Sequence, residues 1–98
     1  MAKKVIWTPE SEKTFEAILT YLETHWTEKE QLNFIAAANK TIETISKQPL
    51  LFRKTKSPDV HEALITKHNL LIYRIKEHQV DLITFWDTRK NPKQKTHK

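Results

Sequence analysis

Three short β-prone segments near the end of the chain constrain its fold most strongly. They occupy Val60–Thr66, Leu70–Ile75 and Val80–Trp86, and short polar stretches at 67–69 and 76–79 separate them. β-branched, aromatic and other apolar residues dominate the segments, and both interruptions are short enough for tight turns. The pattern predicts an antiparallel meander of three strands.

The last of these strands is expected to have two apolar faces. Side chains alternate with a period of two along a strand. One face would carry Val80, Leu82, Thr84 and Trp86, and the other Asp81, Ile83, Phe85 and Asp87. A sheet with one solvated face alternates more regularly. The second face is therefore expected either to bind a partner or to be covered by helices or the C-terminal tail.

Two amphipathic helices are predicted before the meander. Thr8 can cap the first helix, with Pro9 at its first position. The stretch from Thr27 to Glu30 has the form of a capping box, which marks the start of the second helix. Pro49 is expected to end that helix. Their expected apolar stripes are Phe15, Ile18, Leu19, Leu22 and Trp26, then Leu32, Ile35, Ala38, Ile42 and Ile45.

The order of elements predicts an α+β fold. A short β-prone run, Val5–Trp7, precedes the helices. The short apolar loop Pro49–Phe52 after them is expected to plug the helix hairpin rather than to form a binding surface. The result is β-α-α-β-β-β, a small twisted antiparallel sheet packed against an antiparallel helix hairpin. We expect one domain over residues 1–92 and a basic, flexible tail over 93–98.

Composition excludes several classes of site. The 98 residues include no cysteine, which excludes disulfides, thiolate metal sites and cysteine nucleophiles, and no glycine, which excludes glycine-rich phosphate-binding loops. The five histidines show no metal-ligand spacing, so neither a metal nor a cofactor is expected. No apolar run reaches membrane-spanning length or resembles a signal peptide, which favours a cytoplasmic protein.

The formal net charge is +5, and much of it lies in residues 53–56 and in the tail from Arg89 to Lys98. Such a distribution suits nucleic acid or an acidic protein as partner. The simpler alternative is a solvated chain end.

Four stretches, in this order, give the chain a resemblance to a known superfamily. They are Val5–Glu10, Ile45–Pro49, Leu71–Ile75 and Arg89–Pro92. In these the sequence resembles the RelE/ParE toxins of bacterial type II toxin–antitoxin systems, and is most similar to the ParE-like, plasmid-stabilisation branch. The resemblance implies a small twisted sheet against a helix hairpin.

The resemblance also implies growth arrest by binding DNA gyrase or, in the RelE-like branch, by cutting mRNA in the ribosome. It implies a cognate antitoxin that wraps an extended, often acidic segment around the toxin in a hetero-oligomer. An arginine and a histidine common in the superfamily fall here at Leu70 and Asp87. Both replacements weaken the nuclease hypothesis, so a binding toxin without a catalytic site is favoured.

If the chain is instead a metal-independent endoribonuclease, it needs a cation and proton-transfer groups. Arg74, Arg89 or Lys67 could supply the cation, and His61, His68 or Tyr73 could exchange protons. The alternatives are a core position for Tyr73, a surface ion pair for Arg74 and solvated turns for the histidines.

For a binding toxin, the candidate target-binding residues are Trp86, Arg89 and Lys90, because tryptophan and arginine dominate interface hot spots. Alternatively, Trp86 closes the core and Arg89 pairs with Asp87. A third hypothesis is a non-toxic basic module that binds nucleic acid, with affinity that falls steeply with salt.

Overall fold

The computed structural model describes residues 2–88, so the predictions for Arg89, Lys90 and the tail at 93–98 lie outside the described residues. Its elements are β1 (Lys4–Trp7), α1 (Pro9–His25), α2 (Glu28–Lys47), β2 (Arg53–Lys54), β3 (Val60–Thr66), β4 (Asn69–Ile75) and β5 (Gln79–Asp87). The predicted α+β fold is confirmed.

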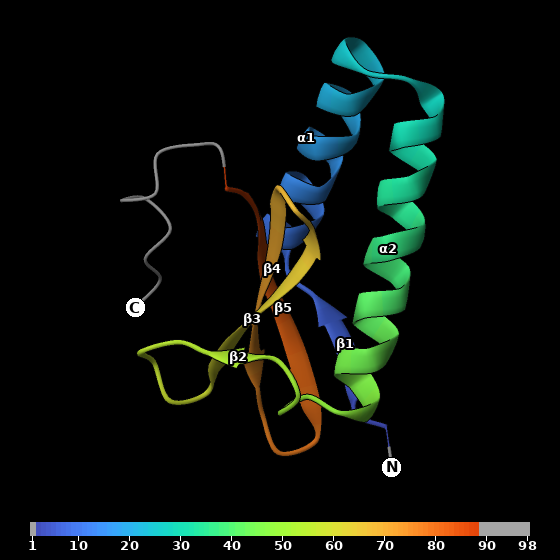
Figure 1. Cartoon of the computed structure of the whole chain (residues 1–98). Helices are drawn as coiled ribbons and strands as arrows, with labels where there is room; N and C mark the ends of the chain where they lie inside the picture. Colours follow the sequence, from blue (N-terminus) through green and yellow to red (C-terminus); the bar gives the residue numbers. More distant parts are fainter. Residues whose placement is uncertain (1, 89–98) are drawn as a thin grey trace.

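The strands form one five-stranded sheet in the order β1-β5-β4-β3-β2. The predicted meander is present as the antiparallel pairs β3–β4 and β4–β5. The sheet is mixed rather than wholly antiparallel, because β1 pairs with β5 in parallel. The helix hairpin supplies the long crossover that a parallel connection needs. Both helices lie side by side against one face of the sheet (Figure 1).

Both helices begin where their capping residues predict. Thr8 Oγ1 accepts a hydrogen bond from the Ser11 N–H at 3.1 Å and donates to the Leu82 carbonyl at 2.6 Å, which ties the start of α1 to β5. Thr27 Oγ1 accepts from the Glu30 N–H at 3.2 Å. α2 ends with Gln48 as its C-cap, directly before Pro49.

The core lies between the helices and the sheet. Its fully buried members are Phe34, Ile45, Ala63, Leu71, Tyr73, Val80, Leu82 and Phe85. The predicted stripes are wrong at two positions, since Leu32 is 58% exposed and Trp26 is 54% exposed. In α2 the buried positions are Phe34, Ala38 and Ile45.

A β-bulge changes the predicted faces of β5. Ile72 pairs with Thr84 whereas the next residue, Tyr73, pairs with Leu82, so Ile83 is an extra residue in β5. The extra residue breaks the period of two. Phe85 consequently packs with Val80 and Leu82 in the core, and Trp86 does not belong to this cluster.

The strand β2 was not predicted, because two charged residues carry no strand pattern. Arg53 pairs with Glu62 and Lys54 with His61. The predicted plug before β2 is only partly correct. Phe52 packs against the core, whereas Leu50 and Leu51 are exposed.

Candidate functional site

One predicted target-binding residue, Trp86, lies on the sheet face opposite the helices, which we call the outer face. Strand pairing places Leu64 beside Leu70, and Leu70 beside Trp86, in one row across β3, β4 and β5. Leu70 is nearly buried, Trp86 is half-buried and Leu64 is 58% exposed. The indole Nε1 of Trp86 is buried and has no hydrogen-bond partner among residues 2–88. The outer face thus carries a row of apolar side chains, and the indole N–H of Trp86 in that row has no hydrogen-bond acceptor among residues 2–88.

Arg74 also lies on the outer face, at the far end of β4 from Leu70. It pairs with Val60 on one side and Asp81 on the other. The pKa of Asp81 is lowered chiefly by its hydrogen bond from Lys76, whose Nζ lies 2.7 Å from Oδ2, and also by the charge of Arg74. Arg74 therefore belongs to a charged end of the outer face.

His61 and Tyr73 lie on the helix-facing side of the sheet, where their rings stack with centroids 5.7 Å apart. His61 is 2% exposed, and neither ring nitrogen has a hydrogen-bond partner in the described part of the chain. Burial is the main cause that lowers the pKa of His61, with the charge of Lys54 second. The imidazole is therefore neutral near pH 7.

Tyr73 is fully buried, and its hydroxyl donates a hydrogen bond to the Pro49 carbonyl at 2.7 Å. The ring of Phe52 packs edge-on against it at 6.4 Å. Burial raises the pKa of this hydroxyl well above its ordinary value. The side chain holds the segment 49–52 on the helix side of the sheet.

We predict that Tyr73→Phe lowers the free energy of unfolding by about 1 kcal/mol, because a buried hydrogen bond is lost while the ring is kept. Urea denaturation of the two proteins measures the difference. Growth arrest on induction is expected to persist, since the hydroxyl is occupied by a backbone contact. Loss of toxicity at unchanged stability would instead indicate a chemical role for the hydroxyl.

His68 and Lys67 occupy the turn between β3 and β4, at the opposite end of the sheet from Arg74. The His68 carbonyl accepts a hydrogen bond from the Thr88 N–H at 2.8 Å. His68 also lines a cavity of about 420 Å³ between this turn and the helix hairpin, with Trp26 and Phe34. The turn thus joins a candidate cation, Lys67, to a candidate proton-transfer residue, His68, and none of Arg74, His61 and Tyr73 lies there.

A second cavity, of about 430 Å³, adjoins the first and shares Leu22 and Asn69 with it. Asp87, which stands where the superfamily often has a histidine, lines this second cavity and pairs with Asn69 across the sheet. Sequence reasoning missed both cavities, because they arise from the gap between helices and sheet and no local pattern encodes that gap.

The structure divides the described candidate residues among three places. Arg74 lies on the outer face, and His61 and Tyr73 lie together on the helix-facing side of the sheet. Lys67 and His68 lie in the turn at the opposite end. Within residues 2–88 no three His, Asp or Glu side chains cluster as a metal site would require. Neither of the two described helices is long and apolar enough to cross a membrane.

A family model described as ParE toxin of type II toxin-antitoxin system, parDE, matches residues 5–92. The chain belongs to the ParE toxin family. It is therefore a toxin of a type II toxin–antitoxin system, in the RelE/ParE superfamily, as the sequence resemblance implied. No match to a curated protein sequence was found.

Solved structures of similar fold agree with this membership. A chain of the chromosomal ParDE system from P. aeruginosa superposes with a TM-score of 0.74 at 11% identity, covering 88% of this chain and 96% of that one. A YoeB/ParE toxin from Agrobacterium tumefaciens gives 0.63 at 15%, covering 86% and 96%. A chain of the heterotetrameric YoeB-YefM toxin-antitoxin complex from Staphylococcus aureus gives 0.61 at 13%, covering 88% and 97%. At these identities the likeness shows the fold alone.

Proposed function

We propose that this ParE-family toxin arrests growth by binding DNA gyrase, without cutting RNA, and that a cognate antitoxin neutralises it. The observation that carries the proposal is the separation of Arg74, His61, His68 and Tyr73 over two faces and two ends of the sheet. General acid–base cleavage needs such groups within hydrogen-bond reach of one phosphate. The membership of the ParE family supports the same choice.

The proposed contact surface is Trp86 with the basic residues that follow it, Arg89 and Lys90. Trp86 presents a half-buried ring beside Leu70 on the outer face, with a buried indole N–H that no described residue satisfies. An aromatic anchor beside cations has the composition of an interface hot spot. Binding of gyrase there would extend the apolar row.

A supercoiling assay with purified gyrase tests the proposal. The toxin is expected to inhibit supercoiling, and Trp86→Ala to weaken inhibition about 30-fold, as expected for loss of a hot-spot tryptophan. Arg89→Ala with Lys90→Ala is expected to weaken it too, whereas the same change at two exposed α2 residues, Lys29 and Lys40, is expected to leave it unchanged. Denaturation curves separate lost binding from lost folding.

Induction in a bacterial host supplies the opposing measurement. Thymidine incorporation is expected to fall before methionine incorporation, because blocked gyrase stops replication first. Early loss of methionine incorporation, with transcripts cut on ribosomes and gyrase unaffected, contradicts the proposal and favours the endoribonuclease alternative.

The antitoxin is expected to be the product of a neighbouring gene. Toxin–antitoxin complexes occur among the structures of similar fold. Co-expression of this chain with that product is expected to restore growth and to yield a hetero-oligomer on size-exclusion chromatography. Continued arrest despite soluble expression of both proteins would contradict the assignment.

A further inference from the structure

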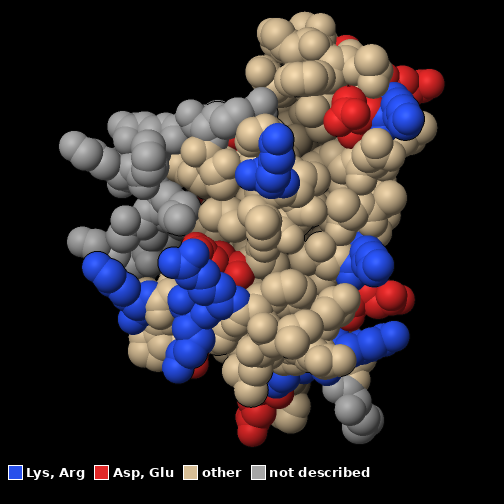
Figure 2. Space-filling model, in the orientation of Figure 1, with Lys and Arg blue, Asp and Glu red and all other residues tan. Residues whose placement is uncertain are grey.

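Positive charge is concentrated in residues 53–59, which comprise β2 and the loop that follows it. We call this segment the basic loop. It contains three cations, Arg53, Lys54 and Lys56, all of them exposed, and one acid, Asp59. Figure 2 shows Lys and Arg side chains gathered over β2 and this loop. The proposed gyrase contact, at Trp86 and the residues after it, leaves the basic loop without a role.

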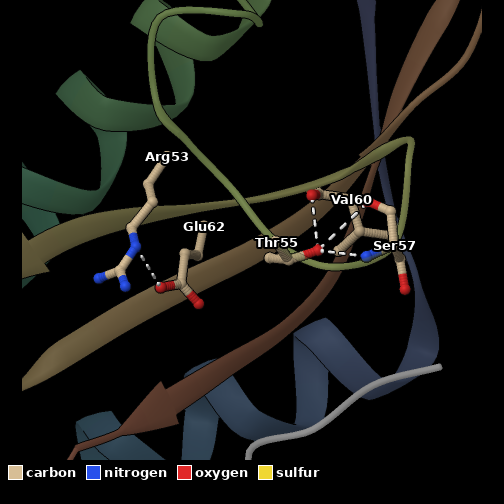
Figure 3. A network of polar contacts seen from close by, with 5 residues as sticks. All are labelled: Arg53, Thr55, Ser57, Val60 and Glu62. Carbon is tan, nitrogen blue, oxygen red and sulfur yellow. Dashed lines mark hydrogen bonds and ion pairs between the residues drawn. The ribbon is translucent and has the colours of Figure 1, made fainter.

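Hydrogen bonds within the basic loop and to the first residue of β3 hold its backbone in place. Thr55 Oγ1 donates to the Val60 carbonyl at 2.8 Å and accepts from the Ser57 N–H at 3.2 Å (Figure 3). The Thr55 N–H also donates to the Val60 carbonyl, and the Val60 N–H donates to the Ser57 carbonyl. The cations therefore project from an ordered backbone, which reduces the conformational entropy that is lost when a ligand binds.

Arg53 is oriented by a carboxylate on the neighbouring strand. Its Nε lies 3.6 Å from Glu62 Oε1, and the two residues pair across β2 and β3 (Figure 3). The Glu62 side chain is only 10% exposed, whereas the Arg53 side chain is 81% exposed. The ion pair is made through Nε, and the two terminal nitrogens of Arg53 bind no other residue among 2–88. A guanidinium with two such N–H groups available matches the geometry of a phosphate.

The chemistry of the basic loop suits phosphates rather than nucleotide bases or a protein surface. Its seven residues include no aromatic side chain, and the preceding Phe52 packs against the core. Single-stranded nucleic acid is held by stacking of bases on aromatic side chains, and protein interfaces have an apolar core. Cations, hydroxyls and ordered backbone are instead the groups that contact the sugar–phosphate backbone of a duplex.

We infer that the basic loop binds the phosphate backbone of duplex DNA, independently of base sequence. Arg53 binds one phosphate through its two terminal nitrogens, and Lys54 and Lys56 neutralise phosphates beside it. Residues 53 and 56 lie at most about 11 Å apart along the chain, and a duplex carries one charge per about 1.7 Å of its axis. The three cations therefore reach several phosphates at once. The contact does not depend on gyrase as the growth target.

The test is a titration of a short fluorescent DNA duplex with the whole chain, in the absence of gyrase. Binding is expected to weaken steeply as salt rises, because bound cations release counterions from the DNA. Arg53→Ala is expected to weaken binding about tenfold at low salt, and to reduce by about one the slope of log affinity against log salt.

Lys40→Ala is the matched control, because it removes the same charge from an exposed position on α2. It is expected to weaken binding by less than about twofold, as a distant charge screened by salt would. Cations elsewhere in the chain contribute equally to both variants, so the comparison isolates the basic loop. Arg53 is exposed, so its variants are expected to fold, and denaturation curves check this.

Arg53→Lys separates an oriented arginine from diffuse positive charge. The variant keeps the charge but loses the planar pair of N–H groups, and is expected to weaken duplex binding about fivefold. Unchanged binding by Arg53→Lys, or equal losses for Arg53→Ala and Lys40→Ala, overturns the proposal. Tighter binding of the single strand than of the duplex also overturns it. So does complete displacement of the duplex by polyglutamate at equal charge, because the surface would then recognise carboxylates as well as phosphates.

Discussion

Replacing Phe85 by alanine is expected to lower the free energy of unfolding by about 3–5 kcal/mol, as for other large-to-small changes in a packed core. Phe85 is 3% exposed, and its ring lies 5.1 Å from that of Phe15 and 5.5 Å from that of Trp7. Such a loss is a large part of the stability of a domain this small. Urea denaturation measures it, or thermal denaturation if the variant is too unstable.

Leu64→Ala serves as the control within the same sheet. Leu64 is 58% exposed, so this change is expected to alter stability by no more than about 0.5 kcal/mol. The comparison tests the bulge at Ile83, because regular alternation would place Phe85 on the opposite face from Leu82. A loss below about 1 kcal/mol for Phe85→Ala would contradict the observed packing.

Acid is expected to destabilise the protein through His61, by up to about 1.4 kcal/mol for each pH unit below the histidine's ordinary pKa. Burial and Lys54 lower the pKa of His61 in the folded state from its ordinary 6.5, and only Asp59 opposes them. Below pH 6.5 the unfolded chain therefore takes up a proton that the folded chain does not. Stability falls from there until the lowered pKa of the folded state is reached.

The measurement is the unfolding free energy of the wild type and of His61→Phe between pH 7.5 and pH 5. Phenylalanine keeps the stack on Tyr73 but cannot bind a proton, so the variant is expected to lose this part of the pH dependence. Asp81 does not interfere in this range, because its pKa is lowered and its contribution is lost only at more acid pH. Parallel pH curves for both proteins would show that His61 is protonated equally in the folded and unfolded states.

Local chemistry made the helices predictable. The helix ends depend on residues that affect only the backbone close to them in sequence, namely Thr8, Thr27 and Pro49. Their positions therefore predict where the helices begin and end. The buried face of α2 was harder to predict. Leu32 and Phe34 are both apolar, and only packing against the sheet decides that Phe34 is buried and Leu32 exposed.

The details of the sheet depend on contacts between distant residues. The bulge at Ile83 is visible only in the pairing of β5 with β4, and β2 exists only because Arg53 and Lys54 meet β3. Neither has a signature in its own segment. A regular period of two therefore predicted the strands correctly but assigned Phe85 to the wrong face.

For the candidate functional residues, too, the sequence predicts the chemistry of the side chains but not their positions in the sheet. The sequence supplied the side chains with suitable chemistry, including His61, Tyr73, Arg74 and Trp86, but their faces were not predictable from it. His61 and Tyr73 pair across β3 and β4 and are buried on the helix side, whereas the next residue, Arg74, points to the outer face. Whether two such side chains lie close together depends both on the alternation of side chains along each strand and on the pairing register between neighbouring strands.

The parallel pairing of β1 with β5 has a consequence for synthesis of the protein. Lys4 to Trp7 are synthesised before both helices and the meander, yet they pair with Gln79 to Leu82, which follow all of these except the end of β5. Contacts so distant in sequence form slowly and late. The pairing of β1 in a nascent chain therefore cannot form until β5 has been synthesised, and the helices are made before the strand that joins β1 to the rest of the sheet.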